Sequence, residues 1–394
     1  SRGSFRREGR TLSAWILFLL WSFPLVVQRF AQRFPMGPPA FLQPSTLARQ
    51  HKNREPTARF MPLSDSLGRP LRDLRISVTD RCNFRCRYCM PREHFGSDHK
   101  FLAKEEILSY EEISKLAESM IPLGLKKLRI TGGEPLMRRD IANLVEMLRR
   151  LGDDLDLAMT TNGVLLKNHA EALKQAGLNR VTVSLDALDR DLFQKMGDTR
   201  HEPSEVIEGI DEALRVGLEV KVNMVVQRSL NETQIVPIAN MCFERTLTPR
   251  FIEFMDVGVT NQWNLEAVVS GQEIRDALSK EYGDLEAVKP DHPSDVARRW
   301  TTPQGYEFGL IQSVTEPFCG DCSRARISAN GSMYTCLFAS EGHDLRALLR
   351  FDANHDQLQH AIQSIWMDRK DRYSEQRTKQ VEVPSKVEMS FIGG

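Results

Sequence analysis

The chain has 394 residues, which is enough for one large α/β domain with extensions. Its 53 basic and 53 acidic residues leave a formal net charge of zero, which argues against a general binder of nucleic acid or of membrane surfaces. An anionic ligand would therefore need a local cluster of basic side chains. The seven cysteines form no evident disulfide framework, so a reducing compartment is favoured over a secretory one.

The first sixty residues differ in composition from the rest of the chain. Up to Asn53 the only acid is Glu8, whereas eight residues are Arg or Lys. The apolar run from Ala14 to Val27 is interrupted by Pro24 and is shorter than the roughly twenty residues of a transmembrane helix, so no stable membrane span is expected. We predict that residues 1–60 are an organelle-targeting leader that directs the protein to the mitochondrial matrix. A leader without a role is the alternative.

From Leu74 onward, short β-type runs alternate with amphipathic helical patterns. The predicted strands are Leu74–Val78, Lys127–Thr131, Leu155–Thr160, Arg180–Leu185, Leu218–Val226 and Arg250–Met255. The predicted helices between them are Ser109–Ile121, Asp140–Leu151, Lys167–Ala176, Pro203–Val216 and Asn231–Phe243. This rhythm is typical of parallel βα units. Because no Gly-x-Gly-x-x-Gly follows the first strand, we predict an α/β fold with a partial (βα)6 barrel over residues 61–270.

Three cysteines follow the first predicted strand in the spacing Cys-x3-Cys-x2-Cys. They are Cys82, Cys86 and Cys89. Three thiolates on one short loop can hold three corners of a 4Fe–4S cluster and leave the fourth iron open. An open iron can chelate an amine and a carboxylate, which reductive cleavage of S-adenosylmethionine requires. A structural zinc site is the alternative, but such a site usually joins two Cys-x2-Cys pairs.

Polar or glycine-rich sequences follow the next three predicted strands as well. They begin at Gly132 (Gly-Gly-Glu-Pro), at Thr161 (Thr-Asn-Gly) and at Leu185 (Leu-Asp). Each of them alone would be an ordinary strand-to-helix turn. Because the carboxyl ends of parallel strands share one rim of a barrel, together with the cysteine loop they predict an active site at that rim.

Cations alternate with apolar residues along three predicted strands. In each strand the cation lies on the same face as the other polar residues, opposite the apolar face. These cations are Arg75, Arg129 and Lys221. A tightly packed barrel would place branched aliphatic side chains inside. We therefore predict a polar cavity that holds a charged ligand. For any one of these cations the alternative is a solvated outer face or an ion pair against a helix.

After Met255 the βα rhythm stops, and residues 271–394 read as a C-terminal extension that covers the open side of the barrel. The elements expected there are helices at Gln272–Lys280, Leu345–Leu349 and Gln357–Trp366 and a strand at Tyr306–Ile311. A second set of cysteines, Cys319, Cys322 and Cys336, lies in this half. Alone it could be half of a zinc ribbon, but beside the first set a second cluster with an open iron is the better interpretation. Cys242 is predicted to be a small buried hydrophobe.

These motifs together resemble the radical S-adenosylmethionine superfamily. With the second cysteine set, Arg324-x-Arg326 and the terminal Gly393-Gly394, residues from Leu67 onward are similar to the GTP 3′,8-cyclase family of molybdenum cofactor biosynthesis. The resemblance implies two 4Fe–4S clusters and S-adenosylmethionine as cofactors. It also implies abstraction of hydrogen from C3′ of GTP and attack of C3′ on C8, which gives (8S)-3′,8-cyclo-7,8-dihydroguanosine 5′-triphosphate.

The resemblance also implies roles for individual residues. The S-adenosylmethionine contacts would be Tyr88, Gly133, Ser184 and Met255. The GTP contacts would be Arg75, Arg129, Thr160, Lys221, Arg324, Ala325 and Arg326. The residues that would take part directly in turnover are Arg324, Arg326, Gly393 and Gly394.

The expected partners are GTP, an external one-electron reductant and a downstream cyclic pyranopterin monophosphate synthase, with no nucleic acid. The oligomeric state stays open, with a homodimer as one option. Two other functions are compatible with parts of the sequence. One is another two-cluster radical enzyme, such as a peptide maturase, and the other is an inactive iron–sulfur or zinc scaffold. More cysteines in the C-terminal half would favour the maturase.

Overall fold

The computed structural model describes residues 63–351, 353–377 and 386–394. The predicted leader, residues 1–60, lies outside these residues. Among the helices of the described part, none combines the length and the apolar content that crossing a bilayer requires.

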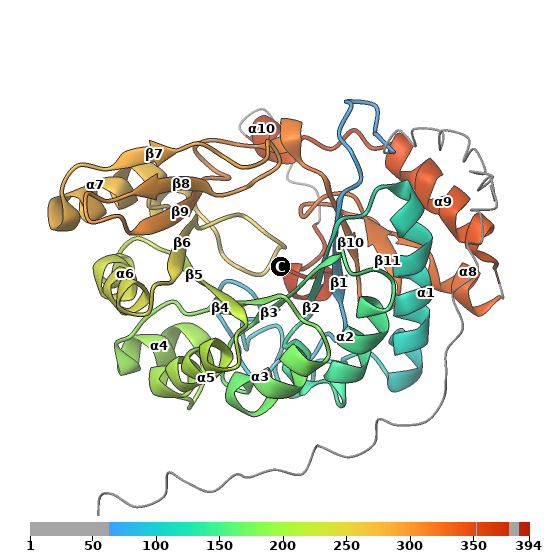
Figure 1. Ribbon diagram of the computed structural model, residues 1–394, viewed down its shortest axis with the longest axis horizontal. Coiled ribbons are helices and arrows are strands. Elements are labelled where there is room, and N and C mark those ends of the chain that lie inside the picture. Colours follow the sequence, from blue (N-terminus) through green and yellow to red (C-terminus); the bar gives the residue numbers. More distant parts are fainter. Residues whose placement is uncertain (1–62, 352, 378–385) are drawn as a thin grey trace, which may run out of the picture. The chain divides into compact units, whose positions relative to one another are not determined.

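Six βα units form the first half of the described chain (Figure 1). Their strands are β1 (Asp73–Ser77), β2 (Lys127–Thr131), β3 (Asp156–Thr161), β4 (Arg180–Ser184), β5 (Glu219–Val226) and β6 (Thr248–Glu253). Helices α1 (Tyr110–Met120), α2 (Ile141–Arg149) and α3 (Leu166–Gln175) follow the first three strands. Helices α4 (Arg190–Gly197) and α5 (Pro203–Arg215) both follow β4, α6 (Ile235–Glu244) follows β5, and α7 (Gly271–Tyr282) follows β6. The strands pair in parallel in chain order, with the helices outside the arc that they form. The predicted α/β fold with a partial barrel is confirmed.

The remaining elements come from the C-terminal part of the chain. They are β7 (Glu286–Val288), β8 (Arg298–Thr301), β9 (Glu307–Ile311), β10 (Arg324–Ile327), β11 (Ser332–Tyr334), β12 (His343–Asp344), α8 (Arg346–Arg350), α9 (His355–Met367), α10 (Tyr373–Gln376) and α11 (Met389–Ile392).

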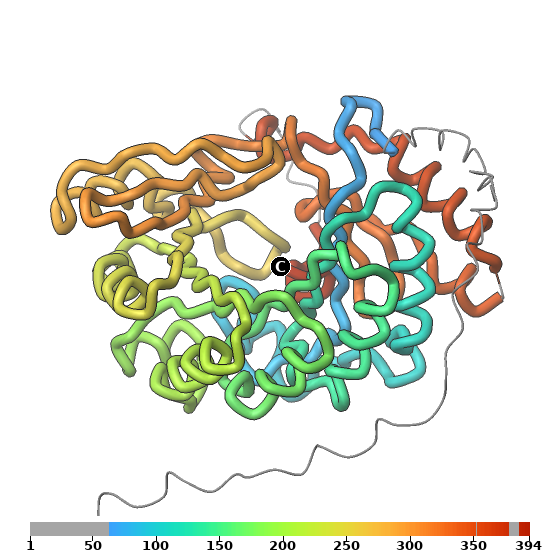
Figure 2. Tube along the Cα trace, viewed as in Figure 1, coloured from blue at the N-terminus to red at the C-terminus, as the bar shows by residue number. Residues whose placement is uncertain are grey.

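The C-terminal strands extend the barrel sheet at both of its edges. Strand β10 pairs in parallel with β1, and β9 pairs in parallel with β6. Antiparallel strands continue outward on each side, so the sheet order is β12-β11-β10-β1-β2-β3-β4-β5-β6-β9-β8-β7. In Figure 2 orange segments accordingly adjoin both the blue and the yellow ends of the arc. Instead of only covering the barrel, the C-terminal half supplies strands to it. The domain boundary at residue 270 stays a prediction.

Helix α4 is a helix that the sequence patterns did not predict. It begins after Asp189, whose carboxylate accepts a hydrogen bond from the backbone N–H of Leu192 at 2.8 Å, as an N-cap residue does. It adds few side chains to the hydrophobic core, because only Phe193, Met196 and Gly197 are buried. A short helix with so few buried residues leaves a weak periodic signal.

Candidate active site

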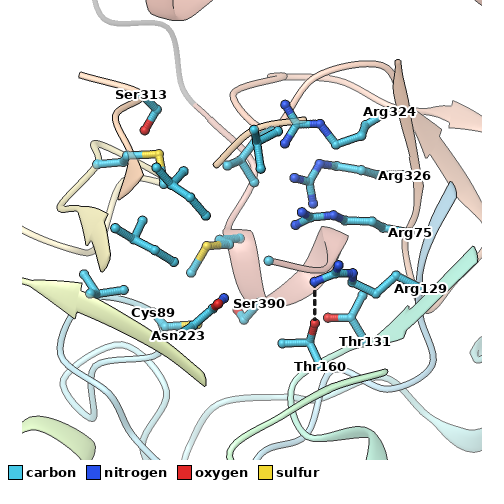
Figure 3. A pocket seen from close by; sticks show the side chains of 18 of the residues that line it. Arg75, Cys89, Arg129, Thr131, Thr160, Asn223, Ser313, Arg324, Arg326 and Ser390 are labelled. Atoms are coloured by element: carbon cyan, nitrogen blue, oxygen red, sulfur yellow. Dashed lines mark hydrogen bonds between the residues drawn. The ribbon is translucent and has the colours of Figure 1, made fainter. Parts of the chain in front are cut away.

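A cavity of about 290 Å³ opens at the carboxyl ends of the strands. All six cysteines of the two predicted triads line it, and so do arginines from β1, β2, β6 and β10. Cys89 and the arginines of β1, β2 and β10 are labelled in Figure 3. The C-terminus lies at the centre of the arc of strands in Figure 1, and Gly394 is one of the lining residues. The structure therefore brings together residues that are more than 300 positions apart in the sequence.

Three arginines stand side by side on one wall of this cavity. Strand pairing places Arg75 opposite both Arg129 of β2 and Arg326 of β10. Figure 3 shows these guanidinium groups, with that of Arg324, arranged along the wall. Burial, followed by the charge of Arg250, lowers the pKa of Arg129 to about 9. A row of buried like charges is costly without an anion, so the arrangement indicates an anionic ligand.

Arg250 belongs to the same site, although sequence reasoning did not select it. It extends from β6 and lines the cavity. Its Nη2 donates to Oγ1 of Thr182 at 3.1 Å, while its buried Nε has no partner. In the sequence Arg250 is the first residue of the predicted strand Arg250–Met255. Its pairing in register with the polar Asn223 of β5 became visible only in the structure.

Two predicted GTP contacts do not reach the cavity wall. Lys221 lies on β5 opposite Thr182, and its Nζ forms an ion pair with Glu219 at 2.9 Å. Ala325 alternates with the two arginines beside it and is fully buried opposite Leu74 on the other face of the sheet. Neither residue is among those that line the cavity. Their roles stay predictions.

The first cysteine triad is held by the loop after β1. Arg85 fixes this loop, because its guanidinium donates to the carbonyl oxygens of Cys82, Phe84 and Phe95 at 2.7–2.8 Å. The hydroxyl of Tyr88 donates to Oδ2 of Asp186 at 2.7 Å, which joins the loop to the end of β4. These bonds orient the three thiols toward the cavity that they line.

The Gly-Gly-Glu sequence after β2 packs directly against this loop. A Cβ atom on Gly133 would lie 2.2 Å from the carbonyl oxygen of Arg81, so only glycine fits there. The carboxylate of Glu134 accepts hydrogen bonds from Oγ1 of Thr161 at 2.8 Å and from the backbone N–H of Asn162 at 2.7 Å. Burial raises the pKa of Glu134 to about 7. Glu134 therefore joins the ends of β2 and β3, which explains two of the predicted rim motifs.

Two buried arginines hold backbone carbonyl oxygens of the second triad, and neither was predicted from the sequence. Arg69 donates from Nη1 to the carbonyl oxygen of Cys319 at 2.9 Å, and Arg369 donates from Nη1 to that of Cys322 at 2.6 Å. Burial would raise the pKa of the Cys322 thiol, but the charges of Arg324 and Arg369 lower it to about 6. The thiolate, which is the form that ligates iron, is therefore favoured at this position.

The donor atoms of both triads fit iron–sulfur clusters. All six thiols are free. Arg69 and Arg369 line the cavity, and each keeps one buried nitrogen without a hydrogen-bond partner, which could donate to a cluster sulfide. In the described part of the chain no three His, Cys, Asp or Glu residues are grouped to hold a single metal ion. Thiolates around one zinc ion lie about 3.8 Å apart, whereas those at separate corners of a cuboidal cluster lie farther from one another.

The diglycine terminus enters the same cavity. The carbonyl oxygen of Gly393 accepts a hydrogen bond from Nη1 of Arg326. Gly393 has φ +77°, and a Cβ atom there would lie 2.5 Å from Cγ2 of Thr131, so both its conformation and its surroundings require glycine. Met389 and Ser390 of α11 also line the cavity, with Ser390 visible in Figure 3.

Known proteins share these sequences and this fold. The Radical SAM superfamily matches residues 76–242, and the family described as Molybdenum Cofactor Synthesis C matches residues 247–375. A GTP 3′,8-cyclase of Staphylococcus carnosus is 45% identical over 337 residues, which are 84% of this chain and 99% of that protein. One of Staphylococcus epidermidis is 46% identical over the same length and with the same coverage. The chain belongs to the GTP 3′,8-cyclase family.

Membership in the GTP 3′,8-cyclase family confirms the predicted family and the prediction of an enzyme. It also confirms the predicted cofactor classes, S-adenosylmethionine and 4Fe–4S clusters. The structure of Streptococcus suis SuiB bound to S-adenosylmethionine supports the fold alone. It has a TM-score of 0.54 and 17% identity, covering 75% of this chain and 68% of that chain.

The predicted mitochondrial location is wrong. These GTP 3′,8-cyclase relatives come from Staphylococcus species, which are bacteria and have no mitochondria. The prediction rested on the composition of residues 1–60 alone, and an arginine-rich, acid-poor composition does not by itself specify a destination.

Proposed function

We propose that this protein converts GTP to (8S)-3′,8-cyclo-7,8-dihydroguanosine 5′-triphosphate with S-adenosylmethionine as co-substrate, as the first step of molybdenum cofactor synthesis. The observation that carries the proposal is a single cavity that contains two cysteine triads and a row of adjacent arginines. The triads suit radical chemistry, and the arginines suit a triphosphate.

The cysteine ligands divide between two clusters. Cys82, Cys86 and Cys89 would hold the first cluster, and Cys319, Cys322 and Cys336 would hold the second. When bound, the first cluster with S-adenosylmethionine supplies radical initiation, and the second supplies an open iron for the guanine edge. Gly133, Tyr88, Ser184 and Met255 line the cavity or the loop beside the first triad, where they would orient S-adenosylmethionine.

The arginines would bind and orient GTP. Arg75, Arg129 and Arg326 form one wall, and Arg250 approaches from β6. Guanidinium groups bind phosphate oxygens through paired hydrogen bonds, so several of them fix the direction of the nucleotide as well as its charge. A nucleotide fixed in this way presents one ribose carbon to the reacting group, and proximity of this kind lowers the barrier.

The diglycine tail would complete the cavity. Gly393 and Gly394 lie beside Arg326 and Thr131. Because glycine carries no side chain, the tail can lie close to a nucleotide without displacing it. Its backbone also excludes water from the site, which protects a radical from side reactions.

Other partners follow from the reaction. Radical initiation consumes one electron. The radical left after C3′ attacks C8 must then gain a second electron and a proton to give an isomer of GTP, so an external one-electron reductant must deliver two electrons per turnover. The cyclised triphosphate would pass to a cyclic pyranopterin monophosphate synthase. No nucleic acid partner is proposed. A peptide maturase is the alternative enzyme, but a buried row of arginines is suited to a small polyanion rather than to a peptide.

The test is an anaerobic incubation of the reconstituted protein with dithionite, S-adenosylmethionine and each nucleoside triphosphate in turn. Mass spectrometry follows 5′-deoxyadenosine and the nucleotides. We expect GTP, and no other nucleotide, to raise 5′-deoxyadenosine above the slow uncoupled background and to be converted to an isomer. Formation of 5′-deoxyadenosine at the same rate with every nucleotide, with none of them consumed, would contradict the substrate. Absence of both products despite full iron loading would contradict the reaction class.

A further inference from the structure

The carboxylate of Asp256, which lies outside the cavity, accepts hydrogen bonds from three side chains near the C-terminal end of the chain. Asp256 directly follows Met255 after β6. Its Oδ2 accepts hydrogen bonds from Oη of Tyr373 at 2.5 Å and from Nζ of Lys386 at 2.8 Å, and its Oδ1 accepts one from Nε of Arg377 at 2.9 Å. The backbone carbonyl of Asp256 also accepts from Nζ of Lys386, at 2.7 Å.

Lys386 is the first described residue of the C-terminal tail, and it is buried. Its side chain is 2% exposed. Its Nζ lies 4.4 Å from the centre of the Tyr373 ring and 5.4 Å from that of Phe338, and the two rings are stacked at 4.5 Å. A buried ammonium is costly unless it is paired. Asp256 provides that pairing, so the position of Lys386 depends on this carboxylate.

The residues after Lys386 dock on two loops of the site. The backbone N–H of Val387 donates to the carbonyl oxygen of Ala339 at 2.9 Å, three residues after the ligand Cys336. The Glu388 carboxylate accepts from the backbone N–H of Val259 at 3.0 Å and from Oγ1 of Thr260 at 3.1 Å. From there α11 leads directly to Gly393 and Gly394 in the cavity.

We propose that Asp256 is a positioning residue that docks the C-terminal tail through Lys386 and thereby sets where Gly393 and Gly394 enter the cavity. Asp256 is not among the residues that line the cavity, so it acts through the tail and not on the substrate. The proposal rests on the proposed function for its catalytic consequence. The docking itself does not depend on which substrate the site accepts.

The charge state of Asp256 suits this role. Burial would raise the pKa of this carboxyl, but hydrogen bonds from Lys386 and Tyr373 and the charge of Arg377 hold it below its ordinary value. Asp256 therefore stays ionised at neutral pH and keeps its attraction for Lys386.

The first experiment measures tail docking directly, by hydrogen exchange and mass spectrometry of the full-length, anaerobically purified protein. We expect the backbone amides of residues 387–392 to exchange at least about tenfold faster in Asp256→Asn and in Lys386→Met. Lys386→Arg keeps the charge and should exchange more slowly than Lys386→Met. Unchanged exchange in Asp256→Asn would overturn the proposal.

Glu253→Gln is the matched control for that experiment. Glu253 is a buried carboxylate at the end of the same strand, and it accepts hydrogen bonds from Gly271, Val314 and Thr315 instead of from the tail. This variant loses a buried charge of the same sign only three residues away. Its tail should exchange at the rate of the unmodified protein. Equal acceleration in Glu253→Gln would overturn the proposal, because it would show general loosening of the fold.

The second experiment asks whether Asp256 acts through the diglycine. The turnover number for GTP is measured for Asp256→Asn, for the protein lacking Gly393 and Gly394, and for the protein with both changes. We expect the combined loss to equal the larger single loss, with the KM for S-adenosylmethionine unchanged. Losses that multiply would overturn the proposal. If the unmodified protein consumes no GTP, the proposed function fails. The hydrogen-exchange experiment then still tests whether Asp256 holds the C-terminal tail in place.

Discussion

Arg75, Arg129 and Arg326 occupy the same level of three neighbouring strands. Asp73 acts on Arg75 and Arg129, but burial and the neighbouring arginines outweigh it and lower the pKa of both. Their arrangement is unfavourable for the fold alone, because like charges repel most strongly where water is excluded. The favourable interaction that offsets this repulsion must come from a ligand that carries several negative charges. A triphosphate meets this requirement better than a monoanion, so in the proposed function these arginines would select for the charge of the substrate.

Arg326→Ala should lower kcat/KM for GTP by about 10- to 100-fold, because one charge-assisted hydrogen bond contributes about 1.5–3 kcal/mol. Slow cleavage of S-adenosylmethionine without GTP consumption should persist. The measurement is 5′-deoxyadenosine and cyclised nucleotide at several GTP concentrations. Arg150→Ala, which removes an exposed arginine paired with Glu146, is the control. Unchanged cyclisation in Arg326→Ala would remove this arginine from the site.

Gly133→Ala should distort the loop of the first triad, because the added Cβ would meet the carbonyl oxygen of Arg81 at 2.2 Å. The expected cost is about 1–3 kcal/mol of unfolding free energy, together with a lower iron content after reconstitution. Urea unfolding and iron analysis measure the two effects. Gly152→Ala is the control, since nothing lies within 4 Å of a Cβ there. Full iron loading of Gly133→Ala would contradict the role of this contact.

At the scale of elements, the second triad depends on a helix that contains none of its ligands. Helix α9 packs against α1, and the fully buried Trp366 near its end donates from Nε1 to the carbonyl oxygen of Arg69 at 3.1 Å. Arg69 in turn holds the carbonyl of Cys319. Arg369, whose guanidinium lies 4.5 Å from the centre of the Trp366 ring, likewise holds the carbonyl of Cys322. The packing of α9 is therefore connected to two proposed cluster ligands through two arginines.

Trp366→Ala should lower the unfolding free energy by about 3–5 kcal/mol, because it removes a large buried side chain. Iron bound at the second triad should fall as well, since the backbone of Arg69 loses its donor. Urea unfolding and iron analysis test both expectations. Met367→Ala changes an adjacent side chain that is 57% exposed and should stay within about 0.5 kcal/mol of the unmodified protein. Equal losses in both variants would contradict this account.

The sequence predicted the barrel elements well for a physical reason. Strands β1 to β6 lie within two residues of their predicted bounds, because βα units bury their apolar faces against sequence neighbours and so leave a local pattern. Strand β10 carries no such signal. It has four residues, two of them arginines, and its partner β1 lies about 250 positions earlier. Pairing over that distance cannot be inferred from local periodicity.

The site residues also divide into those that a local sequence pattern revealed and those that depend on contacts between distant parts of the chain. The two cysteine triads were predicted from spacing, and both line the cavity. Arg69 and Arg369 were missed because they act on backbone carbonyl oxygens of residues that are distant in the sequence. Lys221 was predicted from the alternation of residues along its strand. That alternation shows which face of the sheet a residue lies on, but not how far it lies from the carboxyl end of the strand, where the cavity opens.

At the scale of the whole molecule, the balance of acids and bases sets its behaviour in solution. The formal net charge is zero at pH 7, and the sequence pI is about 7.1. Solubility at low salt should therefore pass through a minimum near pH 7 and rise on both sides, because net charge keeps molecules apart. Light scattering of the protein between pH 6 and pH 9 measures this directly. A monotonic change across that range would contradict the expectation.

Stability should also depend on pH through Asp256. Its pKa is held below the ordinary value of about 3.9, so its contribution is fully present above that pH and is lost as the pH falls through the folded-state pKa. The difference in unfolding free energy between the unmodified protein and Asp256→Asn should be largest at pH 7 and shrink toward pH 3. Urea unfolding at both pH values provides the comparison. A difference that grows in acid would refute this assignment of charge.

The pairing of β10 with β1 has a consequence for how the chain folds as it is made. Asp73 finds its partner Arg324 only after about 250 further residues have been synthesised, which takes roughly 12–50 s at the usual rate of translation. During that interval one edge of β1 has no native partner, and an open strand edge can pair with another chain. Faster or slower translation at one temperature would change the yield of folded protein through this interval, without any change in the stability of the finished structure.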